Sequence, residues 1–269
     1  MPKIKIAIAG VSGRMGHALL ESVFADDELA LYAALDRADS AQIGHDAGAL
    51  FGKNTGINIT SDLDAALQGA DVLIDFTRVD ASLIYLAACK KAHVKHVIGT
   101  TGFTVEQKAN IAAAAMQTAI VFAPNMSVGV TLLIDLVQQA AKVLNDGYDI
   151  EVVEMHHRHK IDAPSGTALR LGEAAAAGLG KDLQDIAIYA REGVTGEREA
   201  GKIGFATLRG GDVVGDHTVV FAGIGERVEI THKASSRATF AIGALRAAKF
   251  LISRQTGLYD MRDVLALNK

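Results

Sequence analysis

The sequence has few cysteines, few prolines and no long hydrophobic run. Its 269 residues contain one cysteine, Cys89, which excludes an internal disulfide framework, and the Ala-Ala-Cys-Lys context predicts a buried helix position. No apolar segment approaches the ~18 residues that a membrane-spanning helix needs. The N-terminus enters an apolar strand pattern directly, without the pattern of a signal peptide. We therefore expect a cytoplasmic protein without a membrane partner.

A strong excess of either charge is also missing. The formal net charge is −4, so no broad basic surface is available for nucleic acid, and we expect no nucleic-acid partner. A composition of 49% hydrophobic and 22% charged residues is ordinary for a globular protein. The length accommodates either one domain or two domains of moderate size.

The N-terminal segment predicts a dinucleotide-binding turn. A β-branched run from Lys3 to Ala9 stops at Gly10-Val11-Ser12-Gly13-Arg14-Met15-Gly16, and a helical pattern follows. Glycine lets the backbone approach a pyrophosphate, and the helix N-terminus offers N–H groups to that anion. The spacing is G-x-x-G-x-x-G rather than G-x-G-x-x-G, so the general motif is only partly met. The alternative is a turn that merely packs the helix on the strand.

The end of the next predicted strand carries an acid and a base side by side. Asp36 lies twenty residues after Gly16, where an acid suits the ribose hydroxyls of NAD. Arg37 is placed to bind the 2′-phosphate of NADP. The pair therefore predicts the use of both NADH and NADPH, whereas the alternative is a solvated charge pair at a strand end.

Strands and helices alternate through the first half of the chain. Strands are predicted at 71–76, 94–98 and 120–123, with helices at 81–92 and 104–117. Repeated βα units predict a Rossmann-type, doubly wound parallel sheet, whose ligands bind at the carboxyl ends of the strands. The polar or glycine-rich clusters fall at those ends: 10–16, 36–37, 76–78, 99–102 and 123–127. His96 lies inside a strand and is interpreted as structural rather than as a ligand.

The second half has a different pattern. A strand is predicted at 149–157, and the later strands at 186–190, 203–208, 217–221 and 227–232 follow one another without full helices between them, which indicates an α+β domain with a mixed or antiparallel sheet. The chain ends in a helical pattern that we expect to return to the first domain. We predict a dinucleotide-binding domain at 1–127 and 238–269, and a substrate-binding and oligomerisation domain at 128–237.

Titratable residues are concentrated between Glu154 and Thr167, at the end of a predicted strand. His156 and His157 should point in opposite directions because strand residues alternate in face. Lys160 follows in a loop, near enough to act on the same small molecule. Pro164-Ser165-Gly166-Thr167 opens a helix whose N–H groups suit a carboxylate or phosphate. The stretch predicts a small anionic substrate, with His156 and Lys160 as acid/base candidates.

A zinc site is an alternative interpretation of the same residues. His156, His157, His159 and Asp162 are suitable ligands by type, but neighbouring strand histidines cannot both face one ion. No cysteine or second histidine pair completes the set, so we predict no metal. A polar loop before a well-capped helix is the simplest alternative, but so many cations in one place need anions nearby.

These motifs together resemble one enzyme family. The segments are G-x-x-G-R-M-G at the start, D-F-T at 75–77, G-T-T-G at 99–102 and E-x-H-H-R-H-K-x-D-A-P-S-G-T-A from Glu154. Later segments, R-E-G-x-T-G-E-R at 191–198, I-G-F-A-T-L-R-G-G-D at 203–212 and I-T-H-K-A-S-S-R at 230–237, agree. Over nearly its whole length the chain resembles the 4-hydroxy-tetrahydrodipicolinate reductases, also called dihydrodipicolinate reductases.

The resemblance implies a reaction and a set of site residues. NADH or NADPH would reduce a cyclic imine dicarboxylate, with loss of water, to tetrahydrodipicolinate in the diaminopimelate route to lysine, in a homotetramer. His156 and Lys160 would be catalytic, while His157, Gly166 and Thr167 would bind substrate. The implied cofactor-binding residues are Gly10, Val11, Ser12, Gly13, Arg14, Met15, Asp36, Arg37, Gly99, Thr100, Thr101, Ala123, Pro124, Asn125 and Met126. Asp36 replaces an expected glutamate, and Pro124 and Met126 replace residues that are often alanine and phenylalanine.

Other classes of protein remain possible at this point. An aspartate-semialdehyde dehydrogenase needs a nucleophilic cysteine, and Cys89 lies in a predicted helix away from any strand end. A homoserine-type dehydrogenase is a second related possibility. A nucleotide sensor would keep the glycine turn but has no need of His156, Lys160 and the helix start together, and a metal-binding module is the remaining alternative.

Overall fold

The computed structural model describes residues 2–268, which form two compact units. The first unit runs to Val128 and resumes at Arg237, and the second covers Gly129–Ser236. The two ends of the expected first domain, residues 1 and 269, lie outside the described residues. Within residues 2–268, every helix is too short or too polar to cross a lipid bilayer.

The first unit is built on a parallel sheet. From β1 (Ile4–Ala9), the chain adds β2 (Leu29–Leu35) and β3 (Ile59–Thr60) on one side and then crosses to β4 (Val72–Asp75) on the other. This puts a switch point between β1 and β4. All pairings are parallel, which confirms the predicted doubly wound sheet. Across the described residues the strand order is β12 (Gly257–Tyr259), β6 (Ala119–Phe122), β5 (Lys95–Ile98), β4 (Val72–Asp75), β1 (Ile4–Ala9), β2 (Leu29–Leu35) and β3 (Ile59–Thr60).

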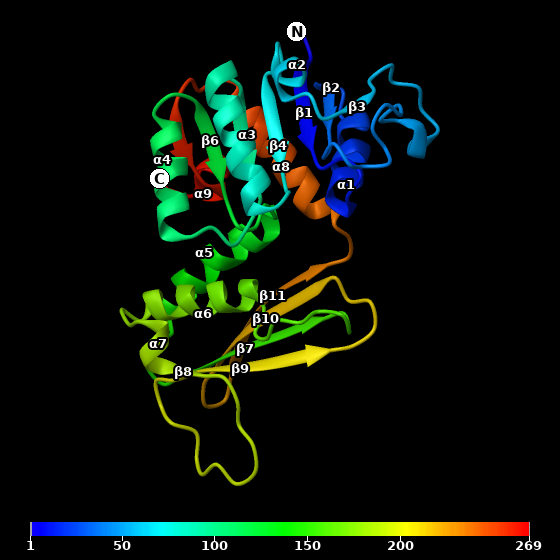
Figure 1. The fold of residues 1–269 in the computed structure, drawn as a ribbon. Coiled ribbons are helices and arrows are strands. Elements are labelled where there is room, and N and C mark those ends of the chain that lie inside the picture. The colour runs from blue at the N-terminus through cyan, green and yellow to red at the C-terminus, as the bar shows by residue number, and fades with distance from the viewer. Residues whose placement is uncertain (1, 269) are drawn as a thin grey trace. The chain divides into compact units, whose positions relative to one another are not determined.

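Helices cover both faces of this sheet (Figure 1). Along β1, Ile6 and Ile8 enter one core and Ala7 and Ala9 enter the other, so residues 6–9 of the strand are apolar without alternation. The first face packs against α1 (Arg14–Phe24), α8 (Ala238–Leu251) and α9 (Met261–Val264); the second packs against α2 (Leu63–Leu67), α3 (Val79–Ala92) and α4 (Val105–Ala115). A short helix, η1 (Ala49–Phe51), lies between β2 and β3.

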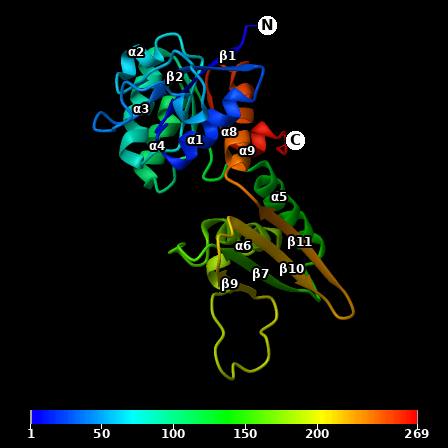
Figure 2. The same cartoon turned by 90° about the vertical axis from the view of Figure 1, so that its right-hand side faces the viewer.

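The second unit contains a mixed sheet with one face covered. Along β7 (Asp149–His156), Ile150, Val152, Glu154 and His156 are buried, and the residues between them are not. The covered face packs on α5 (Val128–Val143) and α6 (Gly166–Gly178), as Figure 2 shows. Within residues 2–268 the strand order is β11 (Arg227–Ala234), β10 (Gly215–Ala222), β7 (Asp149–His156), β9 (Ile203–Arg209) and β8 (Ala187–Ile188). The first two pairings are antiparallel and the last two parallel, which confirms the predicted mixed sheet.

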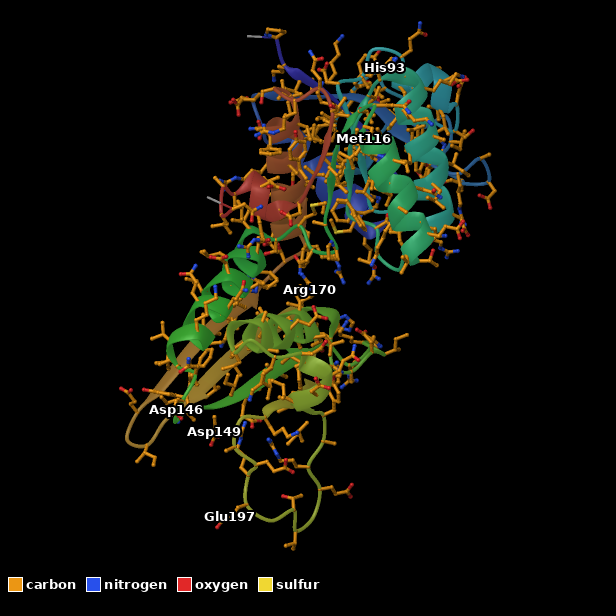
Figure 3. All side chains as sticks on the ribbon, turned by 90° about the vertical axis from the view of Figure 1, so that its left-hand side faces the viewer. His93, Met116, Asp146, Asp149, Arg170 and Glu197 are labelled. Carbon is orange, nitrogen blue, oxygen red and sulfur yellow. The ribbon has the colours of Figure 1, made fainter. Side chains whose placement is uncertain are left out.

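The long segment 189–202, with Glu197 near its tip, joins β8 to β9 (Figure 3). Arg191 makes two hydrogen bonds to Glu151, and Arg198 bonds to Glu151 and Asp149, so the segment is tied to the start of β7. The strand predicted at 186–190 is reduced to β8, because Ile186 ends the short helix α7 (Leu183–Ile186), which Asp182 caps.

The close packing of α8 leads to a prediction about the stability of a variant at Gly243. A Cβ at Gly243 would lie 1.7 Å from the carbonyl oxygen of Met126, which is buried in the first core. We expect Gly243→Ala to lower the free energy of unfolding by about 2 kcal/mol, although alanine favours a helix over glycine by about 1 kcal/mol. Urea unfolding measures the change. Ile242→Ala, at an exposed position of the same helix, is the control; a Gly243→Ala variant as stable as the parent would contradict the packing.

Candidate active site

The glycine turn lies at the carboxyl end of β1, beside the switch point of the sheet. Gly10 has φ +69°, and a Cβ at Gly16 would lie 2.3 Å from the Gly10 carbonyl oxygen. Both positions therefore require glycine. Helix α1 begins after Gly13, which has no side chain to cap the helix, so its first-turn N–H groups are available to an anion. This geometry fits the pyrophosphate of a nicotinamide nucleotide.

The structure brings Asp36 to this turn. The backbone N–H of Ser12 donates to Asp36 Oδ2 at 3.0 Å, and the N–H of Arg37 donates to Oδ1 at 2.8 Å. The exposed Arg37 side chain forms an ion pair with Asp39 at 3.1 Å. The acid predicted for the ribose is thus fixed against the glycine turn, while the guanidinium pairs with an exposed neighbour, Asp39.

A buried polar network joins the ends of β4 and β5. Asp75 Oδ1 accepts from the N–H and hydroxyl of Thr77, and Ser82 bonds to both Asp75 and Thr100. His96 Nε2 lies 3.7 Å from Asp75 Oδ2, beyond hydrogen-bond distance, and both side chains are fully buried. Burial opposes ionisation, but His96, Ser82 and Thr77 outweigh it and hold the pKa of Asp75 below its ordinary value. His96 is thus fully buried inside the sheet, beside Asp75.

The remaining predicted cofactor residues follow β5 and β6. A Cβ at Gly99 would lie 2.3 Å from the Phe76 ring, whereas Thr101 is exposed. The N–H of Ala123 donates to the carbonyl of Ile98 and so ties the two strand ends together. Asn125 accepts from the N–H of Ser127, and Pro124 is exposed. Met126 is different, because its side chain is fully buried in the first core.

In the second unit, His156 lies at the end of β7 on the covered face and is 8% exposed. Its Nδ1 lies 2.5 Å from Glu154 Oε2. Because an ionised carboxylate only accepts hydrogen bonds, Nδ1 carries a proton. A Cβ at Gly215 would lie 3.0 Å from Nε2, so the glycine leaves room at that nitrogen. His157 follows the strand and is half-buried, with its ring 6.2 Å from that of His159.

Glu154 is a buried carboxylate that receives several donors. Arg209 reaches it with both terminal nitrogens, at 2.8 and 2.9 Å, and the N–H of Ser165 donates at 3.1 Å. Burial opposes ionisation, yet the hydrogen bonds from Arg209, His156 and Ser165 hold the pKa of Glu154 below its ordinary value. The carboxylate is therefore ionised at neutral pH.

Lys160 and the start of α6 lie next in the chain. Lys160 Nζ pairs with Asp162 at 2.8 Å, and its side chain is 21% exposed. Ser165 is the N-cap of α6, where its Oγ accepts from the N–H of Ala168 at 3.1 Å. Gly166 is exposed in the first turn, and a Cβ there would meet nothing within 4 Å. The helix start therefore has open space beside a set of N–H groups that suit an anion.

His217 on β10 lies between His156 and the start of α6. Its Nε2 is 3.0 Å from Ser165 Oγ, and its ring is 5.0 Å from that of His156 in an edge-to-face arrangement. Burial, assisted by the neighbouring His156, lowers the pKa of His217 to about 4. His217 is therefore neutral at physiological pH.

The structure thus collects the predicted residues into two groups. The first group lies at the strand ends of the first unit, and the second, with His156, Lys160 and Gly166, lies at the end of β7. Arg209 and His217 were not predicted, because they come from strands 43 or more residues after Gly166 and no spacing rule connects them. In the described part of the chain, no three His, Cys, Asp or Glu side chains are grouped as metal ligands.

A glycine turn at the switch point of a parallel sheet defines a dinucleotide-dependent enzyme, and a cationic group at a helix start suits a small anionic substrate. Residues 4–126 match the family model of the dihydrodipicolinate reductase N-terminus, and residues 129–265 match that of its C-terminus. The chain belongs to the dihydrodipicolinate reductase family. It is an oxidoreductase that uses a nicotinamide cofactor.

Curated relatives share most of the sequence. A 4-hydroxy-tetrahydrodipicolinate reductase of Thiobacillus denitrificans is 64% identical over 98% of this chain and 99% of its own length. Another, from Nitrosospira multiformis, is 58% identical over 100% of both chains. A dipicolinate-bound dihydrodipicolinate reductase of Paenisporosarcina sp. TG-14 has a TM-score of 0.77 at 24% identity and covers 96% of this chain and 97% of its own. That structural likeness concerns the fold.

The lowered pKa of His217 predicts a loss of stability in acid. The unfolded chain binds this proton near pH 6.5 and the folded chain only near pH 4, so the unfolding free energy falls as pH drops through that window. At pH 5 the loss from this group is about 2 kcal/mol relative to pH 7. Urea unfolding of the parent and His217→Gln at both pH values measures it. If the unfolding free energy depends equally on pH in the two proteins, His217 is not held in its neutral form by burial.

Proposed function

We propose that this enzyme reduces (2S,4S)-4-hydroxy-2,3,4,5-tetrahydrodipicolinate to tetrahydrodipicolinate and water, with NADH or NADPH. This is a cytoplasmic step in the diaminopimelate route to lysine. The observation that carries the proposal is a grouping at the end of β7, where the buried carboxylate of Glu154 bonds to His156 and to the start of α6, and its partner Arg209 bonds to the loop of Lys160. The grouping supplies an acid/base residue, a cation and an anion cradle, which a cyclic dicarboxylate imine requires. The relatives that share about 60% of the sequence carry the name of this activity.

The substrate carboxylates are the part that the second unit recognises. One carboxylate binds the first-turn N–H groups of α6 at Gly166 and Thr167, where the helix dipole favours negative charge. His157 and Lys160 contribute to the other contacts. Ser165 keeps the helix start in place, because its hydroxyl caps α6 while its own N–H is bound to Glu154. Anchoring two carboxylates orients the ring before reaction.

Proton transfer is assigned to His156 and Lys160. Because Nδ1 of His156 carries a proton toward Glu154, Nε2 is the nitrogen that exchanges a proton with the substrate. Lys160 donates a proton and places positive charge near the electron-rich product of reduction. The bound cofactor supplies the hydride.

The first unit holds the cofactor in this proposal. The turn Gly10, Val11, Ser12, Gly13, Arg14 and Met15 binds the pyrophosphate, with Asp36 on the ribose and Arg37 on the 2′-phosphate of NADPH. Gly99, Thr100, Thr101 and the stretch Ala123–Met126 lie on the nicotinamide side. Since the Met126 side chain is buried, its contribution comes from the backbone or from packing. These residues make residues 1–127 and 238–269 a dinucleotide-binding domain and residues 128–237 a substrate-binding and oligomerisation domain.

We propose a homotetramer assembled through the second unit. The face of its sheet that the helices leave uncovered carries Val153, Met155, Leu208 and Val220, and Leu208 is 45% exposed. Sheets stack face to face through such residues, about 10 Å apart. Sedimentation equilibrium tests the assembly against a chain mass of 28.2 kDa.

The activity is tested by supplying the condensation product of pyruvate and aspartate semialdehyde and following NADH and NADPH oxidation. Consumption that depends on this product supports the proposal. Tight nucleotide binding without consumption would instead favour a nucleotide sensor.

Two substitutions test the catalytic roles. We expect His156→Ala and Lys160→Ala each to lower kcat more than ~10²-fold while circular dichroism shows an intact fold. His159→Ala and Lys181→Ala remove the same residue types from exposed positions and should turn over at the parental rate. Near-normal turnover of His156→Ala or Lys160→Ala would show that the substituted residue is not catalytic.

A further substitution tests cofactor choice. Arg37→Ala should raise KM for NADPH about tenfold and leave KM for NADH unchanged, because only NADPH carries the 2′-phosphate. Asp39→Asn releases Arg37 from its ion pair and should keep or improve NADPH use. Equal losses with both nucleotides in Arg37→Ala would argue against the assignment.

A further inference from the structure

We infer that Glu154 and Arg209 are positioning residues that fix His156, the Lys160 loop and the start of α6 in one arrangement. The inference rests on the proposed function, to which it adds two residues that touch neither substrate nor cofactor. It is carried by hydrogen bonds that run from this one ion pair to each of the three parts of the site.

Each oxygen of the Glu154 carboxylate accepts two hydrogen bonds. Oε2 accepts from His156 Nδ1 and from Arg209, and Oε1 accepts from Arg209 and from the N–H of Ser165. The side chain is 1% exposed, so solvent cannot replace a lost donor. Since each oxygen has two partners, the carboxylate can shift only by breaking a hydrogen bond in a buried place. Glu154 therefore fixes both the ring of His156 and the first residue before α6.

Arg209 extends the arrangement to the lysine. One terminal nitrogen donates to the carbonyl oxygen of Asp162 at 2.6 Å, in addition to its bond to Glu154. The Asp162 carboxylate pairs with Lys160. The guanidinium thus joins β9, the end of β7 and the loop that carries the lysine. A planar fork of donors is needed for this geometry, which a lysine at 209 would not provide.

The cost of burying these charges supports a functional reason for them. Taking an ion pair out of water is expensive, and well-packed apolar residues often stabilise a fold as well or better. On β7 the neighbouring acid Glu151 forms an equivalent two-bonded pair with Arg191, but it is half-buried and belongs to the segment 189–202. That pair is a matched comparison in the same strand.

The charges around His156 come from every element packed against it. Glu154 on β7 is negative, Arg209 on β9 is positive, and His217 on β10 is neutral. Lys160 and Asp162 in the loop are a close ion pair. Loss of the Glu154 charge leaves Arg209 uncompensated beside the imidazole, whereas loss of the Arg209 charge leaves a carboxylate alone with it. The two losses should therefore move the titration of His156 in opposite directions.

The test follows the His156 ring signals by NMR against pH in protein labelled with ¹³C-histidine, assigned by their absence in His156→Asn. We expect the midpoint to fall by about one pH unit or more in Glu154→Gln and to rise in Arg209→Met. Both variants should lose roughly 10- to 100-fold in kcat, since a small misplacement of catalytic groups is costly. Glu151→Gln and Arg191→Met should leave both the midpoint and kcat at parental values.

A buried charge left alone can unfold the single variants. The double variant Glu154→Gln/Arg209→Met removes both charges together, so it should fold and still lose kcat. Unmoved midpoints and parental kcat in the variants would overturn the inference. If the parent fails to turn over the substrate, the proposed function fails, while the opposite shifts of the two midpoints still decide whether the ion pair controls His156.

Discussion

One buried carboxylate organises the second unit. Glu154 is ionised in a place that water does not reach, so its oxygens must be satisfied by the protein. The donors that satisfy it come from a neighbouring strand, from two residues further along its own strand and from the start of a helix. Two of those donors, His156 and the start of α6, act on the substrate in the proposed reaction, and the third, Arg209, bonds to the loop that carries Lys160. The hydrogen bonds that satisfy the charge of Glu154 are thus the same ones that set the geometry of the site.

A different constraint organises the first unit. Its parallel sheet is covered on both faces, so the strands are mostly apolar, with exceptions such as His96, and the polar and glycine-rich clusters lie at the strand ends. At those ends, glycines occur where a Cβ would collide with backbone or with a ring, as at Gly16 and Gly99. The buried Asp75 network then ties the ends of β4 and β5 together. A cofactor site of this kind needs backbone placed accurately rather than many side chains.

Much of this organisation is visible in the sequence because its signals are local. The alternation of apolar strands and helical patterns predicts the doubly wound sheet, and the lack of full helices between later strands predicts the mixed sheet. Both predictions are confirmed. Short elements such as β3, α2 and α7 escape prediction, because two to five residues carry too little periodicity to be distinguished from loop. The strand predicted at 186–190 is wrong in extent for the same reason.

By itself, the sequence determined the fold class, the family and the residue types of the candidate site, since motifs such as H-H-R-H-K-x-D-A-P-S-G-T are contiguous. Only the tertiary structure decided which face His156 occupies, and which partners it has. That face is the covered one, where Glu154 lies two residues earlier on the same side of the strand. Arg209 and His217 reach the site from strands that pair with β7, and strand pairing depends on register across the sheet rather than on spacing along the chain.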